Sequence, residues 1–178
     1  MLAYHVDRLK IAPFQKGDLI VLNKNFRLIE KETEEMVKKK FPGGITNHGQ
    51  RYLTNAINPN DPFSYLYETI FEHERSINFQ DCPSRFQCHF ALESLEDYQT
   101  WIHIFNKDAR IWKVQVDPNT TFRADAAWFK FGDYGTSIAS ITNQARKYWS
   151  GEFRDDIPQE PELLINGPMK IVDQLYLF

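Results

Sequence analysis

The spacing of apolar residues changes from two to about four within the segment 82–105, CPSRFQCHFALESLEDYQTWIHIF. Phe86, Cys88 and Phe90 alternate with polar residues, which is the period of a half-buried strand. Ser94 is a predicted N-cap, and the apolar residues after it follow the spacing of a helix packed on one side, namely Leu95, Tyr98, Ile102 and Phe105. A strand that runs directly into a helix predicts a mixed architecture rather than an all-α or all-β one.

The remaining periodicities extend this pattern along the chain. Helices are predicted at 27–41, at 136–149 and from Asp61-Pro62 onward, and strands at 2–6, 110–117 and 125–131. The polar segment 46–60 is predicted to be a long ordered loop, of the kind that often carries function. Asn166-Gly167-Pro168 predicts the turn of a closing hairpin, because Asn and Gly tolerate positive φ. The order of elements favours an α+β fold with much antiparallel sheet.

Composition limits the class of protein. A chain of 178 residues that is 42% hydrophobic fits a single domain, 1–178. With a formal net charge of −3, no global basic field favours duplex nucleic acid, and we interpret the lysine run 38–40 as the solvated end of a helix. The first residues lack the apolar region of a secretion signal, and no membrane-length apolar run occurs, so we expect a cytoplasmic protein with no membrane partner. Of the two cysteines, Cys88 is expected in the core.

Common catalytic and cofactor motifs do not occur in the sequence. There is no HExxH, no Walker phosphate loop, no GxGxxG and no G-x-S-x-G elbow. The five histidines show no metal-ligand spacing, so we expect no metal. Composition and periodicity alone therefore reach no further than an α+β domain.

Glu162 is a carboxylate at the start of an apolar predicted strand, in the segment EPELLINGPMKIV. One interpretation is a surface charge that blunts the edge of a sheet. The other is a functional acid whose orientation the apolar strand fixes. The strand alone does not decide between them.

Three segments in order along the chain carry a resemblance: YHVDR at 4–8, PSRFQCHFALESLEDY at 83–98, and EPELLINGPMKIV at 160–172. Together they resemble an uncharacterised family of small bacterial and phage proteins, which in turn resembles the ADP-ribosyltransferase superfamily. The resemblance implies an α+β fold with a split antiparallel sheet, flanking helices and a cleft for NAD. It also implies that NAD is the substrate of a mono-ADP-ribosyl transfer that uses no metal.

The resemblance assigns roles in NAD binding. His5 matches the first-strand position that holds the NAD ribose, and Arg8 is a possible phosphate partner. Tyr98 matches the aromatic that stacks on nicotinamide, with Ser84 and Arg85 as competing candidates and a core position as the alternative for Tyr98. The turn of Ser84, Arg85 and Phe86 is expected to position NAD.

The resemblance also assigns the catalytic acid. Glu162 matches the late-strand glutamate, and Glu160 would be an upstream acid that orients the acceptor. Cleavage of the nicotinamide glycosidic bond develops positive charge on the ribose, and an ionised carboxylate stabilises that charge where it forms. Glu152, in YWSGEF, is a rival acid that could line the cleft together with Tyr148 and Trp149.

The acceptor is expected to be a macromolecule, either a protein or a single-stranded nucleic acid stacked on aromatic side chains. Relatives by fold include bacterial toxins and antiphage effectors, so an antitoxin or inhibitor protein is a possible partner. Two alternatives stay open: a non-catalytic module of the same fold that binds a nucleotide or a partner, and a hydrolase. The hydrolase would be an NAD glycohydrolase using Glu162 or an unrelated enzyme using Glu152 or Asp156.

Overall fold

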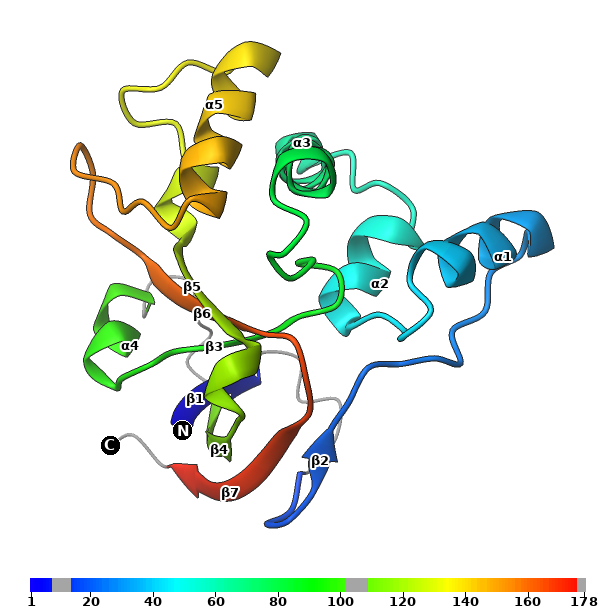
Figure 1. Cartoon of the computed structure of the whole chain (residues 1–178), viewed down its shortest axis with the longest axis vertical. Helices are drawn as coiled ribbons and strands as arrows, with labels where there is room; N and C mark the ends of the chain where they lie inside the picture. The colour runs from blue at the N-terminus through cyan, green and yellow to red at the C-terminus, as the bar shows by residue number, and fades with distance from the viewer. Residues whose placement is uncertain (8–13, 102–108, 176–178) are drawn as a thin grey trace.

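Two antiparallel sheets form the centre of the computed structural model, which describes residues 1–7, 14–101 and 109–175 (Figure 1). The first sheet has the strand order β1-β4-β7-β2 and consists of Leu2–Asp7, Arg110–Gln115, Met169–Leu175 and Leu19–Ile20. The second has the order β3-β6-β5 and consists of His89–Ala91, Pro161–Ile165 and Thr121–Asp125. With several helices added, the fold is mixed α+β, as the sequence predicts.

The two sheets enclose an apolar layer. Val114 of β4 pairs with Ala3 of β1, and both are fully buried against Leu163 and Ile165 of β6. Trp112, Val114 and Val116 all lie in this layer, which confirms the single buried face predicted from their alternation. An isolated bridge between Tyr4 and Leu92 ties the first sheet to the second.

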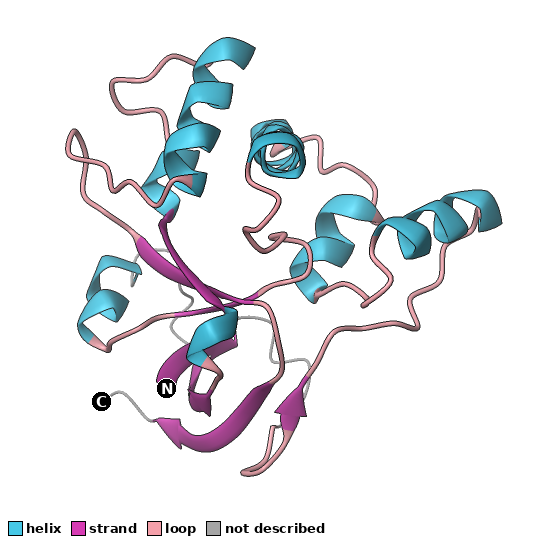
Figure 2. Cartoon of the chain, viewed as in Figure 1, coloured by secondary structure: helices cyan, strands magenta, loops and turns pink. Residues whose placement is uncertain are grey.

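Two helices pack side by side on the other face of the three-stranded sheet: α3, Pro62–Asn78, and α5, Ile138–Trp149 (Figure 2). Their apolar faces contact Leu164 of β6 and Ala124 of β5. Both helices begin close to their predicted starts. Cys88 is fully buried in this second core, as expected.

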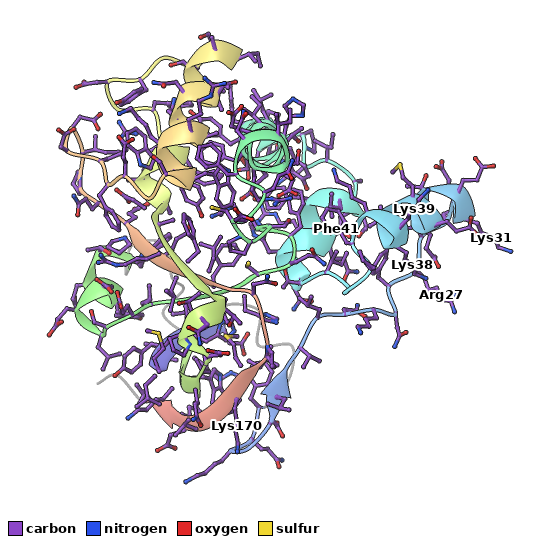
Figure 3. The ribbon with its side chains drawn as sticks, in the orientation of Figure 1. Arg27, Lys31, Lys38, Lys39, Phe41 and Lys170 are labelled. Atoms are coloured by element: carbon purple, nitrogen blue, oxygen red, sulfur yellow. The ribbon has the colours of Figure 1, made fainter. Side chains whose placement is uncertain are left out.

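A third apolar cluster holds the N-terminal helices, α1, Lys31–Lys40, and α2, Asn47–Leu53. Phe41 is buried there, whereas Lys31, Lys38 and Lys39 extend from α1 (Figure 3). Lys38 pairs with Glu34 at 2.5 Å, an i,i+4 contact that fits the interpretation of this segment as a solvated helix.

Helix α2 lies where the sequence predicts a loop at 46–60. The side chain of Thr46 accepts a hydrogen bond from the backbone N–H of Gly49 and so caps the helix. Gly49 is a poor helix former in isolation, but a Cβ there would lie 2.3 Å from the carbonyl oxygen of Phe86. The close approach of α2 to the Phe86 carbonyl therefore requires glycine at position 49. The same glycine lowers the helix propensity of this segment, which is why the sequence predicts a loop.

The predicted strand 125–131 is wrong. Only its first residue belongs to a strand, β5, and Ala126–Phe129 form a 3-10 turn, η2. The carboxylate of Asp125 accepts the N–H of Ala127 and starts this turn. The buried guanidinium of Arg154 donates to the carbonyls of Ala127 and Lys130, so both stay bonded without a strand partner.

The predicted closing hairpin is also wrong, although both of its strands exist. β6 pairs with β3 and β5, whereas β7 pairs with β4 and β2. Gly167 is not one of the glycines with positive φ, and the N–H of Asn166 instead donates to the carbonyl of Thr120 at 2.8 Å. The chain thus passes from one sheet to the other at this point.

The predicted strand and helix of 82–105 are both present but shorter. The strand is β3, and the helix is α4, Glu96–Trp101. Ile102 and Phe105 lie outside the described residues. Among the described residues, no helix combines the length and apolar character needed to cross a membrane.

Candidate functional site

Glu162 is a buried carboxylate in the central strand of the three-stranded sheet. It pairs with Ala124 across β5 and is 6% exposed. Side chains alternate along a strand, so Leu163 faces the other sheet, whereas Glu162 and Leu164 face α3 and α5. The interpretation of Glu162 as an edge charge is therefore wrong.

Arg85 brings a guanidinium to this carboxylate from the turn before β3. Its Nη1 donates to Glu162 Oε1 at 2.5 Å, and the two side chains are almost equally buried. The rings of Phe90 and Phe129 lie 4.8 and 4.2 Å from the guanidinium carbon, which is cation–π distance. Burial alone would lower the pKa of Arg85, but Glu162 and Glu68 raise it well above its ordinary value.

Tyr148 of α5 completes the contacts of Glu162. Its hydroxyl donates to Glu162 Oε1 at 2.7 Å and accepts from Arg85 Nη1 at 2.5 Å. Burial raises the pKa of Tyr148 well above its ordinary value, an effect that the nearby Arg85 only partly offsets. The hydroxyl therefore stays protonated and serves as a donor.

Glu68 of α3 holds the other side of the guanidinium. Its carboxylate accepts from Arg85 Nε at 3.0 Å and from Nη2 at 3.1 Å. His48 of α2 places Nε2 3.0 Å from Glu68 Oε1. Burial would raise the pKa of Glu68, but Arg85 and His48 lower it to about 2.

The arrangement leaves one carboxylate oxygen available. Arg85 and Tyr148 both bind Oε1 of Glu162, and no other side chain within the described ranges donates to Oε2. Glu68 and Glu162 thus place two carboxylates around the guanidinium of Arg85.

Ser84, Arg85 and Phe86 form the turn that is predicted to position NAD. Of these three residues, Arg85 is the one that contacts Glu162. The hydroxyl of Ser84 donates to Glu72 of α3 at 3.0 Å. Phe86 is buried against Phe41 in the N-terminal cluster. Both side chains are engaged away from Glu162.

The predicted first-strand residues lie apart from this centre. His5 shares a face with Ala3 in the layer between the sheets, and its Nδ1 donates to the carbonyl of Phe90 at 2.8 Å. A carbonyl only accepts, so Nδ1 carries the proton and Nε2 the lone pair. Burial lowers the pKa of His5. Arg8 lies outside the described residues.

Tyr98 lies on α4, half-buried, and not in any of the three apolar clusters. Trp101, one turn further along the same helix, donates from Nε1 to the carbonyl of Pro161 at 2.8 Å. Residues three apart share a helix face, so Tyr98 lies on the side of α4 that faces the start of β6. Its stacking on nicotinamide stays a prediction.

The rival acids lie in other surroundings. Glu152 is exposed and pairs with Lys147 at 3.0 Å. Asp156 pairs with Arg154, and the buried Glu160 pairs with Lys130. Glu162, by contrast, contacts Arg85.

Glu68 is not identified in the sequence analysis, because the buried face of α3 is predicted from its apolar residues alone. A signal was present: Glu68 precedes Phe71 by three positions and Glu72 by four, so carboxylates lie on the buried face of the helix. A buried carboxylate requires a partner, and that requirement points to an arginine elsewhere in the chain.

Metal-ligating side chains and cysteine thiols offer no second candidate site within the described ranges. There, no three His, Cys, Asp or Glu side chains form a group that could hold a metal ion. Cys82 and Cys88 are both free, and burial raises the pKa of each thiol. A thiol with a raised pKa is a poor nucleophile at neutral pH.

The fold and the site define an α+β protein with a buried arginine–carboxylate centre between a sheet and two helices. The family model described as "Protein of unknown function (DUF2441)" matches residues 3–176, so the chain belongs to this family. A search of curated proteins finds no match.

Proposed function

We propose that the protein transfers ADP-ribose from NAD to a macromolecule, with Glu162 as the catalytic carboxylate. The observation that carries the proposal is the way Glu162 is held: Oε1 is fixed by Arg85 and Tyr148, and no side chain within the described ranges donates to Oε2. A carboxylate fixed through one oxygen presents the other in a defined direction, as preorganised electrostatic stabilisation requires.

In this reaction, Oε2 accepts a hydrogen bond from the 2′-hydroxyl of the nicotinamide ribose. The bond between C1′ and the nicotinamide nitrogen breaks, nicotinamide leaves with the electron pair, and positive charge develops on the ribose. The carboxylate stabilises this charge. The nucleophile of the acceptor then bonds to C1′ and loses its proton. Water in place of the acceptor gives the glycohydrolase reaction.

The proposal includes the fold. We assign the two sheets to the split sheet of ADP-ribosyltransferases, with Glu162 near the start of a strand in the second sheet. The support is the passage of the chain from one sheet to the other between β6 and β7. Arg85 and Tyr148 orient the acid, and no step is assigned to His5, because its side chain lies between the sheets.

The test is nicotinamide release from NAD by the purified protein, with and without cell extract as a source of acceptor. Release that depends on extract supports the transferase. Release from NAD alone supports the glycohydrolase, and no release under either condition contradicts both and supports a binding module. Mass spectrometry of protein and nucleic acid from the extract then locates the added ADP-ribose.

The site assignment is tested by Glu162→Gln, which keeps the shape and removes the charge. We expect the rate to fall about 100-fold or more, the size typical of losing a preorganised electrostatic group. Glu152→Gln is the control, because Glu152 is exposed and its carboxylate pairs with Lys147 and Ser150. Full activity of Glu162→Gln together with loss in Glu152→Gln would overturn the assignment.

A further inference from the structure

Glu68 occupies one whole side of the Arg85 guanidinium. Its two oxygens accept from Nε and Nη2 at 3.0 and 3.1 Å, which leaves Nη1 for Glu162 and Tyr148. Each of the three guanidinium nitrogens is thus engaged. Only one of them, Nη1, reaches the carboxylate that is proposed to act on NAD.

The surroundings hold this orientation. Phe90 and Phe129 pack near the guanidinium, and the ring of Tyr148 lies 5.3 Å from its carbon. Glu68 itself is fixed by α3 and lies 3.0 Å from Nε2 of His48. The direction in which Nη1 points is therefore set by a carboxylate on a different element from Glu162.

An arginine without a second carboxylate prefers to bind one carboxylate through two parallel hydrogen bonds. If Glu68 did not hold Nε and Nη2, Arg85 could turn and bind both oxygens of Glu162. It would then occupy Oε2, the oxygen that the proposed reaction gives to the ribose. The charge of Glu68 opposes this rearrangement.

We infer that Glu68 is a positioning residue that restricts Arg85 to one oxygen of Glu162 and keeps Oε2 available to the substrate. This inference rests on the proposed function. It makes Glu68 a positioning residue and not a catalytic one, because its proposed effect is exerted through Arg85.

The test compares Glu68→Gln with Glu72→Gln. Glu72 is a matched control on the same helix: it is 3% exposed against 4% for Glu68, and it binds Arg75 through two hydrogen bonds at 2.9 and 3.0 Å. Each variant leaves an arginine beside a neutral amide: Arg85, whose side chain is buried, or Arg75, whose side chain is partly buried. A purely structural role predicts similar losses of stability and activity from the two.

We expect Glu68→Gln to lower kcat for nicotinamide release about 10- to 100-fold, with KM for NAD changed less than about threefold, because the affected contact strengthens in the transition state. Glu72→Gln should keep kcat within about threefold of the wild type. Glu68→Asp, which keeps the charge, should recover part of the loss. Equal kcat values for Glu68→Gln and Glu72→Gln would overturn the inference.

A second measurement separates this inference from the proposed function. If the wild type releases no nicotinamide, the proposed function fails. The free energies of unfolding of the single and double variants still test whether Glu68 and Glu162 are coupled through Arg85. Glu68→Gln and Glu162→Gln should be non-additive, since both act on Arg85, whereas Glu72→Gln and Glu162→Gln should be additive. Additivity in the first pair would overturn the positioning role.

Discussion

Arg85 and Glu162 lie 77 positions apart in the sequence and meet at 2.5 Å, both buried between the three-stranded sheet and α3. Removing both charges from water costs several kcal/mol per ion, which a buried pair offsets only when its remaining hydrogen bonds are made. Here Glu68 and Tyr148 make them. The pair therefore links the turn before β3 to β6 and specifies one arrangement of the site.

Tyr148→Phe tests the hydroxyl that fixes Glu162. The variant keeps the ring packing and removes the hydroxyl that donates to Oε1 beside Arg85, so we expect a loss of about 1–3 kcal/mol in the free energy of unfolding. We expect kcat for nicotinamide release to fall about tenfold. Urea denaturation and steady-state kinetics measure the two effects.

Tyr65→Phe is the matched control for this change. Its hydroxyl makes one longer hydrogen bond, 3.3 Å to the carbonyl of Ala56, with no contact to Glu162. Its kcat should stay at the wild-type value. If Tyr148→Phe also leaves kcat unchanged, the hydroxyl has no part in orienting the acid.

Tyr98 is tested by a pair of substitutions on α4. Tyr98→Phe keeps the ring and should change kcat/KM less than about threefold. Tyr98→Ala removes a stacking surface, which is typically worth about 1–3 kcal/mol per base, so kcat/KM should fall about tenfold or more. Equal and negligible effects of both variants on nicotinamide release would remove Tyr98 from the site.

The sequence predicts those elements whose periodicity follows from burial on one face. Trp112, Val114 and Val116 alternate because β4 lies against the second sheet, and α3 and α5 repeat at three and four because both lie on one core. The errors fall where a distant residue decides the local structure. Arg154 stabilises the turn at 126–129, and the two final strands join different sheets because their partners lie elsewhere in the chain.

Two residues of the candidate site, Glu162 and Arg85, could be predicted from the sequence, but their contact and the role of Glu68 could not. Glu162 and Arg85 both stand out in the sequence, each with a separate proposed role. Their pairing depends on the register of β6 against β3 and on Glu68 of α3, and neither can be derived from local spacing. Local patterns specify which residues are buried, whereas the choice of partner is a tertiary property.

Gly49→Ala tests the close approach that positions α2, and with it His48. The added Cβ would lie 2.3 Å from the carbonyl oxygen of Phe86, so the helix or the turn must move. We expect a loss of about 1–3 kcal/mol in the free energy of unfolding, as for other overpacked sites, despite the better helix propensity of alanine. Gly135→Ala is the control, because its nearest neighbour, Ser140 Oγ, would lie 3.5 Å away. Chemical denaturation compares the two, and similar stabilities would contradict the close contact.

His89 makes the stability of the fold depend on pH. Burial, and to a lesser degree His5, lowers the pKa of His89 from 6.5 to about 4. Below about pH 6.5 the unfolded chain binds a proton that the folded chain does not, so stability falls between pH 6.5 and 4, by about 3 kcal/mol in total. Urea denaturation across this range should show the loss, and His89→Gln should reduce it. An unchanged slope in His89→Gln would contradict a buried neutral His89.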